Sequence, residues 1–185
     1  MAAYTTIDDP EAHFQTIIYT GASGTNPRSH TLPADTDMQP DLIWLKKRNT
    51  TEFHVVTDAV RGAGKMLAAN NSDGQSTDSN SGYISAFNSD GFTTTNGTSN
   101  ELYVNTTGAT YVGWCWKAGG STSSNTTGAT SSTVSVNSTS KFSIVQWTGT
   151  GSTTTVGHSL GVVPDMFITK PTGSGSWGAY HQGSA

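Results

Sequence analysis

The sequence contains one β-motif in a complete copy and then a second copy that stops in mid-pattern. Residues 14–21 (FQTIIYTG) return as residues 142–149 (FSIVQWTG), at an offset of 128. Residues 40–46 (PDLIWLK) return as residues 164–170 (PDMFITK), at an offset of 124. Matching order, spacing and chemistry identify an internal repeat, which must be recognised before other patterns are interpreted. Repeated β-modules without an evident catalytic set are typically building or binding units.

Smaller matches extend the repeat, because His30 corresponds to His158 and Phe53 corresponds to Trp177. The change of offset places a four-residue insertion in the first copy, within residues 33–39. The second copy has no counterpart of residues 83–87 or of the later Trp-Cys-Trp block. We therefore expect a half sandwich with an exposed inner face, completed by sequence after residue 185 or by a neighbouring chain.

Composition favours a polar β-protein. Only 33% of the residues are hydrophobic and 12% are charged, against about 45–50% and about 25% in ordinary domains. The remaining share consists mainly of Ser, Thr, Asn and 21 glycines, which suit strand surfaces and turns. The low charge and the five tryptophans argue against a disordered chain. Short segments rich in β-formers and bounded by turn residues are expected to be strands: 14–20, 41–47, 53–57, 65–69, 83–87, 91–95, 101–104 and 110–117.

No window of the sequence carries the apolar period of a long helix. We predict an all-β fold, in which an antiparallel β-sandwich or jelly-roll-like (lectin-like) module is followed by a partial second copy. Residues 1–12 are expected to be an N-terminal arm and residues 13–118 the β-sandwich module. Residues 119–140 form a Gly/Ser/Thr-rich linker, in which residues 133–136 could be a short strand, and residues 141–185 are the incomplete second module.

The segment 110–117 (TYVGWCWK) is the most distinctive. On a strand, Trp114 and Trp116 point to one face while Cys115 points to the other. The favoured interpretation places both indoles in the core and makes Cys115 an inert thiol. The alternative exposes them as a platform for sugars. Trp114, Trp116 and Trp177 are accordingly the candidate glycan-binding or interface residues.

Other chemistry-bearing patterns favour structural roles. Residues 58–65 (DAVRGAGK) fail the spacing of a phosphate-binding loop, so an Asp58–Arg61 ion pair bracing a glycine-rich turn is preferred. Residues 71–78 offer oxygen donors but lack the pattern of an EF-hand, and Asx turns account for them. The five histidines show no paired ligand spacing, and no nucleophile elbow is present. We predict no cofactor, no metal and no enzymatic activity.

Charge and hydropathy exclude several partners. The net charge is −4 with scattered basic residues, so no nucleic-acid partner is expected. No apolar run reaches membrane-spanning length, and residues 1–20 lack the pattern of a signal peptide. A chain made in the cytoplasm with an extracellular type of surface is what a virion protein requires.

The chain resembles a family of marine bacteriophage virion structural proteins, of pelagiphage and cyanophage type, built from repeated β-modules of uncharacterised function. The resemblance covers nearly the whole chain and rests on residues 4–10 (YTTIDDP), 40–46 (PDLIWLK), 58–62 (DAVRG), 87–92 (FNSDGF), 111–119 (YVGWCWKAG) and 156–161 (VGHSLG).

The resemblance implies a non-enzymatic virion protein, made in the host cytoplasm, that forms the N-terminal, tail-attaching part of a tail fibre or appendage involved in host attachment. Expected partners are other tail or capsid proteins, further copies of the chain (a trimer in many fibres) and a host-surface glycan. The alternatives are a capsid decoration protein and a free carbohydrate-binding module, with a glycan hydrolase as the weaker rival.

Overall fold

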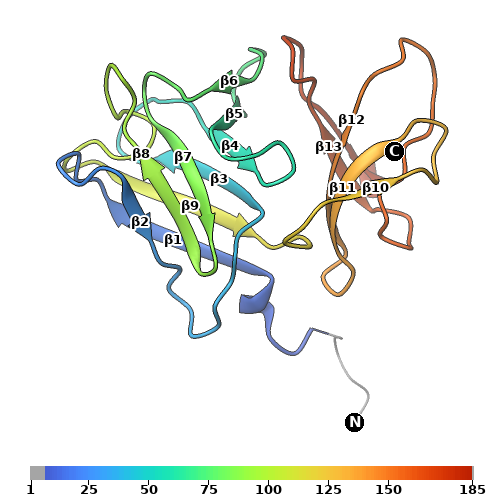
Figure 1. Cartoon of the computed structure of the whole chain (residues 1–185), viewed down its shortest axis with the longest axis horizontal. Helices are drawn as coiled ribbons and strands as arrows, with labels where there is room; N and C mark the ends of the chain where they lie inside the picture. The colour runs from blue at the N-terminus through green and yellow to red at the C-terminus, as the bar shows by residue number, and fades with distance from the viewer. Residues whose placement is uncertain (1–6, 185) are drawn as a thin grey trace.

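The computed structural model describes residues 7–184 and is an all-β protein (Figure 1). Every pairing between its named strands is antiparallel, and short 3-10 turns lie at η1 (Pro10–Ala12) and η2 (Gln182–Ser184). Within residues 7–184, no helix has the length and apolarity needed to cross a membrane.

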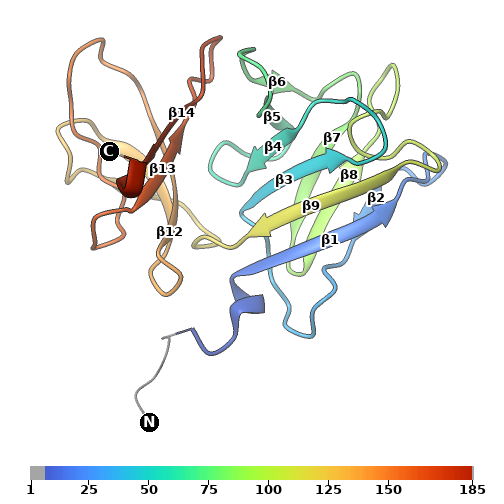
Figure 2. The same cartoon turned by 180° about the vertical axis from the view of Figure 1, so that it is seen from behind.

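The first module is an antiparallel sandwich of two sheets, as the sequence predicts. The larger sheet contains, in spatial order, β1 (Phe14–Thr20), β9 (Thr110–Trp116), β3 (Leu42–Lys47), β4 (Val55–Asp58), β5 (Lys65–Ala68) and β6 (Ser76–Thr77). The smaller sheet contains β2 (Arg28–His30), β8 (Gly91–Thr95) and β7 (Tyr83–Asn88). Figure 2 shows β3, β9 and β1 side by side, with β7 and β8 behind them.

The core of this module lies between the two sheets and follows from strand alternation. Along β1 the residues are alternately exposed and buried, and the same period of two runs along β3 and β9. The largest fully buried hydrophobic side chains come from several different strands and loops: Tyr111, Phe92, Met38, Ile43, Leu45, Ile84, Val55 and Val104. Each such burial contributes about 1.5–3 kcal/mol of transfer free energy.

The favoured interpretation of the tryptophans in β9 is wrong, because the opposite face of the strand enters the core. Cys115 is fully buried, whereas Trp114 and Trp116 are half-buried on the outer face of the sheet. Gly113 explains this phase, since a Cβ atom there would lie 3.1 Å from Ile17 Cγ2 and 3.8 Å from Phe92 Cζ. The close approach of Ile17 leaves little room for a side chain at Gly113, so this face of β9 packs inward and the indoles turn outward. Burial raises the pKa of the Cys115 thiol to about 12, which keeps it protonated and unreactive.

Segment 101–104 forms a turn, although its composition predicts a strand. The N–H groups of Val104 and Asn105 both donate to the Glu101 carbonyl, at 3.1 and 2.9 Å. The buried Asn105 amide then donates to the carbonyls of Ala22 and Thr25, at 3.1 and 3.0 Å. These hydrogen bonds from a side chain to the backbone of another loop stabilise the turn in place of pairing between strands.

The second module contains two small sheets. One consists of β10 (Ser123–Asn125), β11 (Ser132–Asn137) and β12 (Phe142–Trp147), and the other of β13 (Met166–Thr169) and β14 (Gly178–His181). β11 covers the short strand expected at residues 133–136, whereas β10 lies in the part of the range expected to be a linker without strands, so there the structure differs from the prediction. Two buried polar side chains of these strands are held by distant partners, because Asn125 Nδ2 donates to Ser159 Oγ (2.7 Å) and Ser132 Oγ donates to the Gly157 carbonyl (2.9 Å).

His30 is a buried histidine of the first module. Its ring stacks on Phe92 and contacts Tyr19, and Nε2 lies 3.0 Å from Thr94 Oγ1. Burial, helped by the nearby charge of Arg28, lowers the pKa of His30 to about 4. His30 therefore supports the core as a neutral ring.

This pKa predicts that stability falls as the pH drops from about 6.5 to about 4. In that window the unfolded chain binds a proton at His30 and the folded chain does not, so protonation favours unfolding by up to about 3 kcal/mol. Denaturant titrations of the wild type and of His30→Gln at pH 7 and pH 4.5 measure the effect.

The His30→Gln variant should lose this part of the pH dependence, whereas His181→Gln, at an exposed position, should retain it. Equal pH dependence in the wild type and in His30→Gln would contradict the assignment.

Candidate functional site

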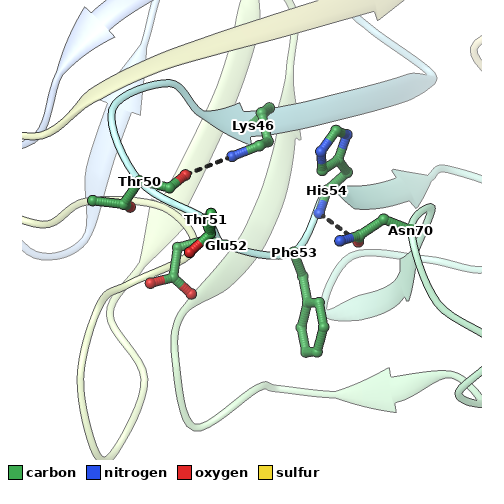
Figure 3. A pocket seen from close by; sticks show the side chains of 7 residues that line it. All are labelled: Lys46, Thr50, Thr51, Glu52, Phe53, His54 and Asn70. Carbon is green, nitrogen blue, oxygen red and sulfur yellow. Dashed lines mark hydrogen bonds between the residues drawn. The ribbon is translucent and has the colours of Figure 1, made fainter.

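A hollow of about 550 Å³ opens beside the loop that joins β3 to β4 (Figure 3). Seven residues line it: Lys46, Thr50, Thr51, Glu52, Phe53, His54 and Asn70. Six of the seven belong to a single stretch, so the hollow is shaped mainly by one connection of the larger sheet. It is the best candidate for a small-ligand site on the first module.

Hydrogen bonds between side chains and the backbone fix the shape of the hollow. Lys46 Nζ donates to the Lys47 carbonyl and, at 3.0 Å, to the Thr50 carbonyl, which folds the loop back on the strand. The His54 N–H donates to Asn70 Oδ1 at 3.1 Å, which leaves the Asn70 amide nitrogen available to a ligand. Within residues 7–184, that nitrogen and the Glu52 carboxylate form no hydrogen bond.

The hollow therefore presents a carboxylate, an amide, hydroxyl groups, an ammonium group and an aromatic ring. Burial and the Lys46 charge lower the pKa of His54, so its imidazole is neutral at neutral pH. A set of mixed donors and acceptors beside aromatic surface suits a neutral, hydroxyl-rich ligand better than an anion or a metal ion.

Tryptophan side chains continue from the hollow across the outer surface of the larger sheet. The register places Thr16, Trp114 and Trp44 in one row. Trp44 meets Trp114 edge to face, with ring centroids 6.2 Å apart, and lies 6.4 Å from His54. We call Trp44, Trp114 and His54, with the exposed Ile18, the outer face. The predicted candidate Trp114 is thus linked to the hollow through Trp44 and His54, of which His54 lines it.

Trp116 lies at the seam between the two modules. Its ring packs against Phe14 at 5.0 Å and stacks with Phe142 of the second module at 6.4 Å. Close by, Asn137 Nδ2 donates to His13 Nδ1 at 2.8 Å. Trp116 is therefore an interface residue inside the chain rather than part of a sugar platform.

Trp177 holds a second point of the seam. Its Nε1 donates to the Ala68 carbonyl at 3.0 Å. The adjoining loop also binds the first module, since the Gln75 N–H donates to the Thr172 carbonyl (2.7 Å) and the Gly175 N–H to the Ser72 carbonyl (2.8 Å). The structure does not bring the three predicted tryptophans together, and two of them join the modules.

A buried carboxylate fixes the segment that enters the second module. Asp41 has no exposed surface, and its Oδ2 accepts hydrogen bonds from the N–H groups of Ala118 (2.8 Å) and Gly120 (3.0 Å). The Gly119 N–H donates to Ser135 Oγ at 2.9 Å. Hydrogen bonds to a buried charged group are worth about 1.5–3 kcal/mol. The expected Gly/Ser/Thr-rich linker thus begins as an anchored connection.

Two other sequence patterns have the expected structural roles. Asp58 and Arg61 form an ion pair of 2.5 Å, and Gly62 and Gly64 adopt positive φ in the turn that follows. Asn71 Oδ1 accepts from the Asp73 N–H at 3.1 Å, which is an Asx turn. Among the described residues, no group of three or more side chains is arranged to hold a metal ion.

Sequence reasoning missed the hollow and Trp44. The available signal was the alternation of Ile43, Trp44 and Leu45, which sets Trp44 on the opposite face from two aliphatic residues. No sequence pattern predicts that Glu52 and Asn70 line the same hollow, because their proximity depends on the path of two loops.

The family model described as "Domain of unknown function (DUF7483)" matches residues 9–185, and the chain belongs to this family. No curated protein and no solved structure matches the chain.

Replacing Trp114 by Ala should cost clearly less stability than a core truncation, because its ring is only half-buried on the outer face. We expect Ile43→Ala, at a fully buried site, to cost about 2–5 kcal/mol, and Trp114→Ala to cost less than half as much. Chemical denaturation of the two variants measures the loss in the free energy of unfolding. Equal losses would contradict the position of Trp114 on the outer face and indicate a core residue.

Proposed function

We propose that this member of the DUF7483 family is a non-enzymatic structural protein of a phage virion, forming the tail-attaching part of a tail fibre or appendage involved in host attachment. The observation that carries the proposal is a rigid sandwich fastened to a second module whose apolar strands are open. Such a combination suits a subunit that works inside an assembly.

The open strands are β13 and β14. Met166, Phe167 and Ile168 are each exposed to between 48% and 54%, and Phe167 stacks on Tyr180, which is also exposed. Contiguous exposed apolar groups usually mark an interaction surface. In a fibre or appendage, neighbouring subunits would cover this hairpin, which supports expected partners among tail proteins and further copies of the chain.

The hollow and the outer face support a role in attachment. Trp44, Trp114 and Phe53 offer aromatic surface on which a sugar ring can stack, and Glu52, Asn70 and the threonines offer hydrogen bonds to its hydroxyls. A host-surface glycan is therefore the proposed ligand. The same feature favours the second candidate, a carbohydrate-binding module, for which the hollow alone would suffice.

A capsid decoration protein is the remaining alternative, because the open hairpin could equally dock on a capsid. Gold-labelled antibodies against the first module, applied to intact particles and viewed by electron microscopy, separate these roles. Labelling at the tail supports the proposal, and labelling of the capsid shell supports decoration. Particles without label, from lysates that contain the protein, would exclude a virion component.

Glycan arrays test the attachment role at residue level. Trp44→Ala and Glu52→Gln should each weaken binding about tenfold or more, since they remove a stacking surface and a hydrogen-bond acceptor. Trp147→Ala is the matched control, because Trp147 is an exposed tryptophan of the second module, away from the hollow. Binding that persists in both hollow variants, or no binding to any glycan, would refute glycan recognition by this site.

A further inference from the structure

A second hollow, of about 160 Å³, adjoins the first. Among residues 7–184, Phe53 is the one lining residue that the two hollows share. Its neighbours are divided between them, since His54 lines the first hollow and Val55 lines the second. Asn70 and Asn71 are divided in the same way. Two short segments of chain therefore form a ridge between the hollows.

Hydrogen bonds hold the two segments of the ridge together. The His54 N–H donates to Asn70 Oδ1 at 3.1 Å, and the Ala69 N–H donates to the His54 carbonyl at 2.8 Å. Phe53 is 39% exposed, and its side chain points in the opposite direction from that of His54 (Figure 3). Its ring also meets the ring of Tyr103, with centroids 5.7 Å apart. A ligand that occupies both hollows must therefore pass along the Phe53 ring.

The second hollow combines apolar surface with a few oriented polar groups. Val55 and Met66 are buried lining residues, whereas Asp73 and Ser76 are exposed ones. Asp73 Oδ2 accepts from Asn71 Nδ2 at 2.7 Å, and the Asp73 N–H donates to Asn71 Oδ1 at 3.1 Å, so the carboxylate is held in place. Asp73 Oδ1 forms no hydrogen bond within residues 7–184. This composition is typical of sites for small ligands.

The second module supports one wall of the second hollow. Asp73 and Gly74 line the hollow, and Lys170 Nζ donates to the Asp73 carbonyl at 2.8 Å. A Cβ atom at Gly74 would lie 3.1 Å from the Thr172 carbonyl oxygen, so the two loops are in close contact. The Gln75 N–H donates to the same carbonyl at 2.7 Å. Because contacts from another module fix this loop, the second hollow is formed before any ligand arrives.

We propose that the two hollows are adjoining subsites of one groove, which binds an oligosaccharide with at least one ring on each side of Phe53. This inference rests on the proposed recognition of a glycan and adds the length and the charge of the ligand. Phe53 and Tyr103 offer apolar faces to the sugar rings, and Asp73 accepts hydrogen bonds from hydroxyl groups. Among the residues that line the second hollow, Asp73 alone is charged, so a uronate or sulfated ring is repelled and a neutral ring is accepted.

Three ladders of neutral sugars, each from one to four units, are the probes: glucose to cellotetraose, glucose to maltotetraose, and N-acetylglucosamine to its β-1,4-linked tetramer. Calorimetric titration into the chain of residues 1–185 measures their affinities. In at least one ladder the affinity should rise about tenfold or more between one unit and two or more units, because the second ring binds as part of a ligand that is already held.

Two substitutions at exposed positions locate the second ring. Ser76→Trp fills the second hollow, and Asp73→Ala removes its carboxylate acceptor. Each should lower the ratio of two-unit affinity to one-unit affinity about tenfold. Ser152→Trp and Asp165→Ala are the matched controls, because both positions are exposed and line neither hollow, and they should keep the wild-type ratio.

Circular dichroism and melting check that the variants fold, and Asp73→Ala remains informative if the tryptophan variant unfolds. Equal affinity for one unit and for longer forms in every ladder would overturn the groove, and so would no binding of any ladder up to about 10 mM. An unchanged ratio in the folded variants would also overturn it. A single unit that binds without a gain in longer forms leaves glycan recognition by the first hollow intact, and labelling of the virion tail is a separate result. Failure of the groove and failure of the proposed function can thus be told apart.

Discussion

The structure depends on the double pairing of β9. Its residues pair with β1 on one edge and with β3 on the other, joining segments about seventy to one hundred residues apart in the chain. Gly113 admits the Phe92 ring of the second sheet, and Tyr111 stacks on Tyr19. One strand thus closes the larger sheet, supplies the centre of the core and turns two tryptophans outward.

The same strand determines how the modules are connected. Its last residue, Trp116, stacks with Phe142, and the backbone that follows is bound by the buried Asp41 carboxylate. Because the chain leaves the sandwich in a fixed direction, the second module is positioned from its first residues. Among residues 7–184, that module contains the counterparts of β1, β3 and β4 but not of β9, and Phe167 is exposed where its counterpart Ile43 is buried.

The sequence predicts the strands where period and turn residues agree. β1 (Phe14–Thr20) and β8 (Gly91–Thr95) have the expected bounds, and the all-β sandwich is confirmed. It does not predict which face of β9 is buried, because alternation defines two faces and tertiary contacts, such as that of Ile17 with Gly113, select one. The sequence allows a strand at residues 133–136, where β11 lies, but it misses β10, whose Asn125 is held by the distant Ser159. Of the candidate tryptophans, only Trp114 belongs to the aromatic row that leads through Trp44 to His54 of the hollow. The shape of the hollow depends on loop contacts, which leave no period in the sequence.

Amide hydrogen exchange of the chain of residues 1–185, resolved by residue, tests most directly whether β9 is what separates a closed module from an open one. The amides of β1 and β3 that face β9 should exchange only with global unfolding, at a free energy of about 5–15 kcal/mol. Their counterparts in β13, which pairs only with β14, should exchange faster by several orders of magnitude. Equal protection of the two sets would contradict the account, because it would mean that the second module is closed without a strand in the place of β9.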